Sequence, residues 1–352
     1  MGLLTRALVA IVAVGCGPKP LRVVEAPDVL DVPDTSDALV TDARDATADA
    51  REASLPDVVV ADLPPGPSCA DDPSRPDCAR VRVPASAPFC VGLPATAANA
   101  SWNASPPLCG LTLSAFEVDA REVTVGRFRP FFARWAAGAL PAWREARFAN
   151  NITVRVPLAP RTVVSEWSPA VTGCTWSEAP DPARDRHPLN CVGWTLAMYF
   201  CAWEGGHLVT ATEYEYLARW HGAAAGEDRA FPWGAEAPAC ERVHYGPCAG
   251  DDGLETRRAG SLAPTAGGVF DLAGNVADLV ADDLAPYATL SASPCWGRAD
   301  PLCQPTLTGA HHARGSSHQN DSEPLLRTAF RTTGGSGDAS PARGFRCAYP
   351  AR

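Results

Sequence analysis

The clearest periodic pattern begins near Leu111. The segment FEVDAREV alternates apolar and polar residues, as a strand with one buried face does. The following residues, TVGRFRPFFARW, change to a period of three to four, which predicts an amphipathic helix. Thr124 stands directly before this run and is a residue type that caps helix N-termini. The apolar positions at helical spacing are Val125, Phe128, Phe131, Phe132 and Trp135.

Two more helices are predicted further along the chain. Thr195 precedes the run LAMYFCAWE, and a glycine pair beginning at Gly205 ends it. This run is apolar nearly all round, so we expect a buried helix with Cys201 inside the protein. A third helix begins after Thr210, because Thr210 and Glu213 have the spacing of a capping box.

The remainder of the chain lacks long regular patterns. Beyond Trp220 the sequence is rich in Gly and Pro, with short strand candidates and no long helical run. No internal repeat is present. Strands and helices in this unequal mixture predict an α+β fold with much irregular loop.

The cysteine content changes the picture of where the protein works. Thirteen cysteines accompany only two methionines, a composition that favours export to an oxidising compartment over a reducing cytosol. Twelve cysteines remain after Cys16, enough for six disulfides. Five pairs are close in sequence, although spacing does not prove connectivity: Cys69 with Cys78, Cys90 with Cys109, Cys174 with Cys191, Cys240 with Cys248, and Cys295 with Cys303.

The N-terminus carries a second sign of export. Arg6 precedes a short apolar run, residues 7–14, which is too short to span a bilayer. Gly15 and Cys16 follow directly and look like a bacterial lipobox, in which the cysteine is acylated. We therefore predict a lipoprotein signal peptide at residues 1–16 and lipidation of Cys16. An ordinary signal peptide that takes Cys16 away is the alternative.

The next segment, residues 17–67, has a separate character. It holds eleven acidic residues against four basic ones and no aromatic residue, so it cannot bury enough apolar surface to fold. We expect an extended, disordered acidic tether. Residues 68–110 read as a cysteine-stapled N-terminal segment. Nothing basic or aromatic-rich indicates a nucleic acid partner.

Five motifs occur in an order that identifies a family. They are EVTVGRF (122–128), HPLNCVGWTLAMYFCAWEGGHLVTATEYEYLAR (187–219), FPWG (231–234), FDLAGNVADLV (270–280) and ARGFRCA (342–348). Together they resemble the formylglycine-generating, sulfatase-modifying factor family, over residues 111–352. The resemblance implies a C-type-lectin-like α+β fold that is loop-rich and disulfide-stapled. It also implies a disulfide between Cys201 and Cys347. The enzymes' second structural disulfide has no cysteine at either matching position.

The motif FDLAGNVADLV is a candidate calcium site. Its carboxylates and its tight glycine turn suit a hard cation that prefers oxygen ligands. The resemblance implies calcium ligands at Asp271, Gly274, Val276 and Asp278. An acidic turn satisfied by backbone amides is the alternative.

The resemblance does not extend to the catalytic cysteines of the family. Family oxidases bind copper through two cysteines in the loop that corresponds to residues 314–331, and no cysteine occurs there. Cuprous copper needs soft thiolates, so we expect neither a copper site nor formylglycine formation. The positions nearest the missing cysteines, His318, Gln319 and Glu323, are a candidate ligand groove. His311 and His312 are expected to be solvated loop histidines rather than ligands.

No nucleophile elbow, phosphate-binding glycine loop or zinc motif is present. The sequence therefore predicts an outer-membrane or cell-surface lipoprotein of the bacterial envelope, attached through its lipid anchor only. Its family domain would be non-catalytic and would bind an extended peptide, a glycan or an envelope protein. A metal-dependent oxidoreductase of altered chemistry in the same groove is the alternative.

Overall fold

The computed structural model describes Cys69 and residues 75–93, 107–224, 227–287, 295–307, 309–331 and 338–351. All of them belong to one compact unit, Pro56–Arg352. Cys16, the signal peptide and the whole tether assigned to residues 17–67 lie outside the described residues, so those assignments remain predictions.

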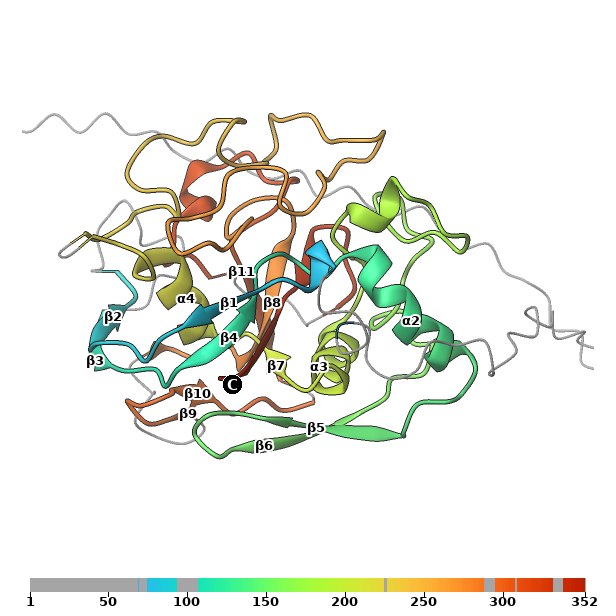
Figure 1. Ribbon diagram of the computed structural model, residues 1–352, viewed down its shortest axis with the longest axis horizontal. Coiled ribbons are helices and arrows are strands. Elements are labelled where there is room, and N and C mark those ends of the chain that lie inside the picture. The colour runs from blue at the N-terminus through green and yellow to red at the C-terminus, as the bar shows by residue number, and fades with distance from the viewer. Residues whose placement is uncertain are drawn as a thin grey trace, which may run out of the picture. The chain divides into compact units, whose positions relative to one another are not determined.

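Two central sheets organise the described residues (Figure 1). The first has the order β1-β4-β13-β7, with every neighbouring pair antiparallel. The second has the order β11-β8-β12, with β12 parallel to β8. The strands are β1 Arg80–Val83, β4 Phe116–Asp119, β7 His207–Leu208, β8 Ala277–Asp283, β11 His311–Arg314, β12 Arg343–Phe345 and β13 Cys347–Pro350. The motif GFRCAY thus crosses from one sheet to the other at Arg346.

Three two-stranded sheets lie outside these two. They pair β2 Phe89–Val91 with β3 Leu108–Leu111, β5 Trp143–Arg147 with β6 Thr153–Pro157, and β9 Cys295–Trp296 with β10 Leu302–Cys303. The predicted boundary at Leu111 does not separate two bodies, because β1 pairs with β4 along its whole length. A four-residue strand carries too little pattern to show this from sequence.

Helix α2, Val125–Ala136, begins as the sequence predicts. Thr124 is the N-cap, and its hydroxyl accepts a hydrogen bond from the Arg127 amide at 3.2 Å. Helix α4, Ala211–Arg219, confirms the capping box. The Thr210 amide donates to the Glu213 carboxylate at 2.8 Å, and the Glu213 amide donates to the Thr210 hydroxyl at 3.1 Å.

Helix α3, Trp194–Trp203, begins earlier than predicted, with Gly193 rather than Thr195 as its N-cap. The reason is a tertiary contact. The Glu166 carboxylate accepts a hydrogen bond from the Leu196 amide at 3.0 Å, which satisfies a first-turn donor that has no partner within the helix. A side chain at Gly193 would overlap the backbone of residues 165 and 166, so only glycine fits there. The helix ends as predicted, at Gly205 with φ of 87°.

The described residues also include three 3₁₀ turns, which are η2 Pro76–Cys78, η3 Arg184–Arg186 and η5 Glu323–Leu326. Within the described ranges, no helix is long and apolar enough to cross a bilayer.

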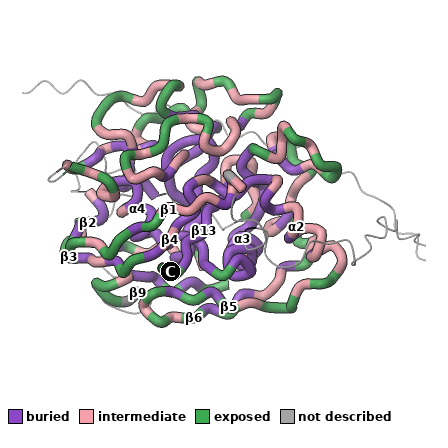
Figure 2. The backbone as a smooth tube through the Cα atoms, in the orientation of Figure 1, coloured by how far each residue is buried: buried purple, intermediate pink, exposed green. Residues whose placement is uncertain are grey.

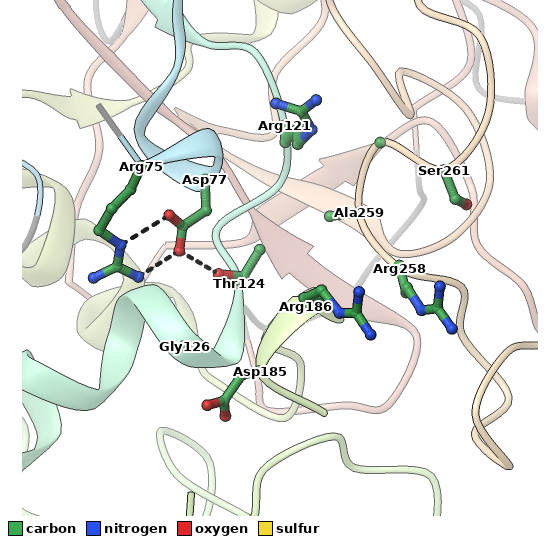
Figure 3. Close-up of a pocket in the computed structure, with 11 residues that line it drawn as sticks. Arg75, Asp77, Arg121, Thr124, Gly126, Asp185, Arg186, Arg258, Ala259 and Ser261 are labelled. Carbon is green, nitrogen blue, oxygen red and sulfur yellow. Dashed lines mark hydrogen bonds and ion pairs between the residues drawn. The ribbon is translucent and has the colours of Figure 1, made fainter. Parts of the chain in front are cut away.

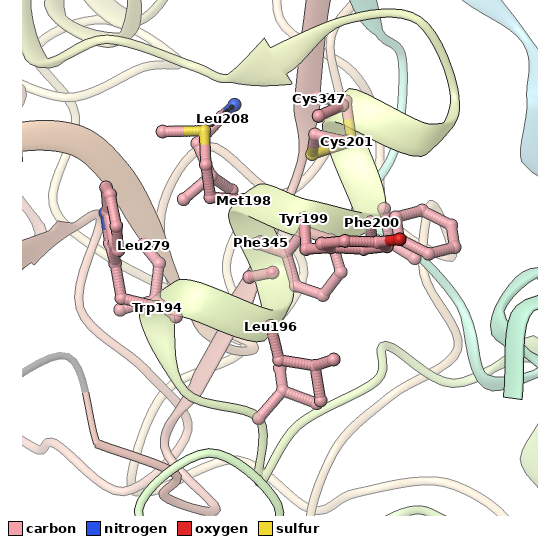
Figure 4. Packing of buried hydrophobic residues seen from close by; sticks show 14 of the residues in the cluster. Trp194, Leu196, Met198, Tyr199, Phe200, Cys201, Leu208, Leu279, Phe345 and Cys347 are labelled. Atoms are coloured by element: carbon pink, nitrogen blue, oxygen red, sulfur yellow. Dashed lines mark hydrogen bonds between the residues drawn. A yellow bond between two sulfur atoms is a disulfide. The ribbon is translucent and has the colours of Figure 1, made fainter. Parts of the chain in front are cut away.

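The hydrophobic core forms around α3 (Figure 4). Nine of its ten residues are buried, as its apolar sequence predicts. Phe131 of α2 packs against Phe200 and Trp203 of α3, with ring centroids 5.4 and 5.3 Å apart. Figure 2 shows the buried stretches along α3 and the central strands, whereas the loops above them are mostly intermediate or exposed.

All twelve cysteines from Cys69 to Cys347 are paired in disulfides. The five close pairs are confirmed, and so is Cys201 with Cys347, which joins α3 to β13 across 146 residues of sequence. The α+β, loop-rich, disulfide-stapled fold is therefore confirmed.

Candidate functional site

The loop after β11 is held against the motif FDLAGNVADLV by backbone contacts. The Gly274 amide donates to the Gly315 carbonyl at 2.8 Å. The His318 amide and its Nδ1 both contact the Asn275 carbonyl oxygen, at 2.8 and 2.7 Å. Because a carbonyl only accepts, Nδ1 carries the proton, and Nε2 is the atom of His318 that is left for other chemistry.

His318 lies at the wall of an open cleft of about 570 Å³. Its Nε2 is 3.4 Å from the Glu255 carboxylate and has no hydrogen-bond partner. Gln319 also lines the cleft, whereas Glu323 does not. Glu323 is exposed in η5 and pairs with Arg327 at 3.3 Å. The other lining residues are Gly246, Cys248, Gly250 and Leu254.

Sequence reasoning missed Glu255, which lines the cleft, and His244, which contacts His318 without lining the cleft. The His244 and His318 rings lie parallel, with centroids 6.2 Å apart. His244 Nε2 donates to the Glu255 carbonyl at 2.7 Å, and burial lowers the pKa of His244. No local signal marks these residues, because His244 meets His318 from within the loop of the Cys240–Cys248 disulfide and Glu255 meets it from the segment after that loop.

A cluster of buried carboxylates lies on the other side of Asn275. Glu122 accepts hydrogen bonds from the Asn275 side chain at 2.7 Å and from the Val276 amide at 3.2 Å. Asp278 pairs with Arg346 at 2.8 Å. Asp271 accepts a hydrogen bond from a backbone amide, that of Gly260.

Burial dominates the electrostatics of this cluster. It raises the pKa of Asp278 to about 6, against the lowering effect of Arg346. Burial also raises the pKa of Asp271. Glu122 has a pKa well above its ordinary value, because burial is reinforced by the charges of Asp271 and Asp278. The charge of Arg346 acts on all three carboxylates and opposes this rise in their pKa values.

The predicted calcium ligands fit a cation in this space. Asp278 Oδ1 is buried without a hydrogen-bond partner, while Oδ2 faces Arg346. Asp271, Gly274 and Asn275 all have positive φ, so the chain turns tightly between the two carboxylates. Within the described residues, no three His, Cys, Asp or Glu side chains converge as a metal site. A calcium ion would therefore depend on the Gly274 and Val276 carbonyls as well as on Asp271 and Asp278.

The expectation of solvated loop histidines at 311 and 312 was wrong. Both residues are buried in β11, with exposed fractions of 5% and 2%. The His311 ring stacks on Trp194 at a centroid distance of 3.7 Å. Burial and the nearby Arg331 hold the pKa of His312 well below its ordinary value. The sequence HHAR has no alternation that would indicate a strand covered on both faces.

Residues 76–351 match the family model of the sulfatase-modifying factor enzyme 1-like domain. The match covers most of the chain, and the chain belongs to this family.

Curated relatives agree with this assignment. A formylglycine-generating enzyme of Thermomonospora curvata is 29% identical over 268 residues, which cover 69% of this chain and 84% of that enzyme. One of Streptomyces coelicolor is 29% identical over 319 residues, covering 82% of this chain and 96% of the enzyme. A hercynine oxygenase of Mycolicibacterium thermoresistibile is 24% identical over 269 residues, 76% of this chain and 58% of that protein.

Among solved structures, PvdO from Pseudomonas aeruginosa has the same fold. Its TM-score is 0.52 at 22% identity, and the match covers 77% of this chain and 94% of PvdO.

Proposed function

We propose that this chain is a non-catalytic member of its family that binds a ligand in the His318 cleft. The observation that carries the proposal is the state of its cysteines. Every cysteine from Cys69 to Cys347 is in a disulfide, and residues 314–331 contain none. Formylglycine formation through two copper-binding thiolates would lack its metal ligands and its nucleophile together.

The cleft has features of a binding site for an extended ligand. It is open, and its polar groups are the His318 imidazole, the Glu255 carboxylate and the Gln319 amide. An open cleft with these polar groups suits hydrogen bonding to a peptide or a glycan. Gly246 and Gly250 let its wall pack closely, because a side chain at either position would meet neighbouring backbone. We propose that class of ligand, or an extended segment of an envelope protein.

We also propose that the domain is held at the bacterial envelope by a lipid on Cys16. Support comes from the signal-like N-terminus, from the acidic run after it and from the six disulfides, which suit an oxidising compartment. Replacing Cys16 with Ser should release the protein from the membrane fraction. Unchanged fractionation of Cys16→Ser would contradict the anchor.

The main proposal is tested by incubating purified protein with a sulfatase-type cysteine peptide, copper and oxygen. We expect no conversion above a control without protein, while the Thermomonospora curvata enzyme in parallel shows that the assay works. Conversion that is lost when a cysteine pair is mutated would overturn the non-catalytic proposal.

One observation favours a second candidate, an enzyme of altered chemistry. The His318 imidazole is oriented by its Nδ1–H bond to the Asn275 carbonyl and presents Nε2 at a cleft wall, which is an arrangement used for general base catalysis. Oxygen consumption or a stoichiometric transition metal in the purified full chain, lost in His318→Ala, would favour this candidate over binding alone.

A further inference from the structure

A second and larger cleft, of about 710 Å³, lies away from His318 and is lined by four arginines (Figure 3). Arg75 lies at η2, Arg121 follows β4, Arg186 ends η3, and Arg258 is in the loop before Gly260. Four separate segments therefore bring guanidinium groups to one space. Lys19 is the only lysine in the sequence, so the use of arginine instead of lysine carries no information about a ligand. The meeting of four arginines from separate segments in one cleft is informative.

The two carboxylates that line this cleft already have partners. Asp77 pairs with Arg75 at 2.6 Å. Asp185 pairs with Arg129 at 2.7 Å, and Arg129 does not line the cleft. The lining therefore carries a surplus of positive charge, although the chain as a whole has a formal net charge of −10.

The remaining arginines are held in place in different ways. Arg258 makes two hydrogen bonds of 2.8 Å to the Asp252 carboxylate, which fix its direction. The Arg121 guanidinium lies over the Phe270 ring, 4.5 Å from its centroid. Arg186 is exposed, and the structure records no ion pair for it within the described residues. Its carbonyl accepts from the Ala259 amide at 3.0 Å, so Arg186 and Arg258 come from adjacent backbone segments.

The first turn of α2 forms another wall of the same cleft, at Thr124 and Gly126. A Cβ at Gly126 would lie 2.9 Å from the Asp185 carbonyl oxygen, so glycine keeps α2 close to η3. The helix dipole adds a partial positive charge on this side. This term only supplements the arginines, which carry the argument.

We propose that this basic cleft binds a phosphate ester, with Arg186 as its main charged contact and with Arg121 and Arg258 beside it. Guanidinium groups bind phosphate oxygens through charge-assisted, often bidentate hydrogen bonds. The volume admits a group the size of a sugar phosphate. The phosphate ester is either a soluble sugar phosphate or a lipid headgroup. This inference is independent of what the His318 cleft binds.

The test is calorimetric titration of the purified full chain at low salt with glucose 6-phosphate, with glucose as the neutral control. A parallel arm measures co-sedimentation with vesicles containing phosphatidic acid, against vesicles of phosphatidylcholine alone. We expect the wild type to bind glucose 6-phosphate or phosphatidic acid, and neither neutral control. The arm that responds identifies a soluble or a membrane source.

Arg186→Gln should weaken binding about tenfold or more, since a hydrogen bond to a charged group is lost. Arg186 is exposed, so this change should leave the melting temperature unaltered. Arg147→Gln is the matched control, because Arg147 is an exposed arginine of β5 outside the cleft. Absence of binding in both arms would overturn the proposal. So would equal binding of glucose, or equal weakening by Arg147→Gln.

Discussion

The carboxylate cluster and the His318 cleft are both in contact with Asn275. The carboxylates of the cluster are buried, whereas the carboxylate at the cleft, that of Glu255, is exposed to solvent. Glu122 and Asp278 are completely buried; Glu122 is hydrogen-bonded to the Asn275 side chain, and Asp278 pairs with Arg346. His318 instead faces Glu255, whose side chain is 60% exposed. We expect substitutions in the cluster to lower the free energy of unfolding strongly, because removing one partner of a buried pair leaves the other charge buried and unpaired. At the cleft, the Glu255 carboxylate that faces His318 remains solvated. We therefore expect substitutions of the cleft side chains to leave the protein folded.

The largest expected difference concerns the disulfides behind the two regions. Cys201–Cys347 adjoins Arg346 and closes 146 residues, whereas Cys240–Cys248 lies at the cleft and closes 8. In the chain-entropy model, removing the first pair as Cys201→Ala/Cys347→Ala costs about 5 kcal/mol, and removing the second costs about 2.5 kcal/mol. Urea unfolding of both double variants measures the two losses. Equal losses of unfolding free energy would contradict the view that the region of the cluster contributes more to stability than the region of the cleft.

A matched pair of alanine substitutions tests the comparison directly. Asp278→Ala leaves Arg346 buried without its partner and should lower the free energy of unfolding by about 3–5 kcal/mol. His318→Ala removes a hydrogen bond to the Asn275 carbonyl and should cost about 1 kcal/mol. Thermal and urea unfolding measure both effects. A larger loss in His318→Ala would reverse the roles that we assign to cluster and cleft.

Calcium should distinguish the two regions, because we expect the ion to bind at the carboxylate cluster and not at the His318 cleft. A bound ion at 100 times its Kd stabilises the folded state by about 2.7 kcal/mol. Chelation should therefore lower the melting temperature of the wild type and of His318→Ala by the same amount. Asp271→Ala should show a much smaller shift, since it removes a predicted ligand. Equal shifts in all three proteins would argue against calcium at this site.

The smallest expected effect is the pH dependence of stability that arises from His312. This residue lies on β11, the strand that pairs with β8. Burial lowers the pKa of His312 in the folded state. Its stabilising contribution is thus fully present above the unfolded pKa of about 6.5 and is lost as the pH falls below it. Between pH 7.5 and 5.5 the loss is on the order of 1 kcal/mol.

His312→Asn should remove this loss, so its free energy of unfolding should fall less on acidification than that of the wild type. The comparison of variant with wild type is necessary because Asp278 acts in the opposite direction. Its pKa, raised to about 6, makes its contribution largest in acid and smaller as the pH rises through 6. Identical pH profiles for both proteins would show that His312 does not titrate as its burial implies.

Features that depend on neighbouring residues could be predicted from the sequence. The Thr124 cap and the Thr210–Glu213 capping box involve residues three apart, and the structure has both. The five close cysteine pairs were likewise predicted, since short loops bring such residues together. Cys201–Cys347 spans most of the folded chain, and only the family resemblance predicted it. The same resemblance indicated His318 and Gln319 as cleft residues.

Contacts between distant segments could not be predicted in this way. The first turn of α3 is capped by Glu166, which lies 30 residues before its partner. Glu255 reaches His318 from another loop, and the cleft arginines come from four segments between residues 75 and 258. None of these residues has a sequence neighbour that marks its role, because the energy of each contact arises only after the chain has folded. Motif and spacing therefore determined the family, the caps and the short disulfides. Long-range packing determined which charges are buried and which face a ligand.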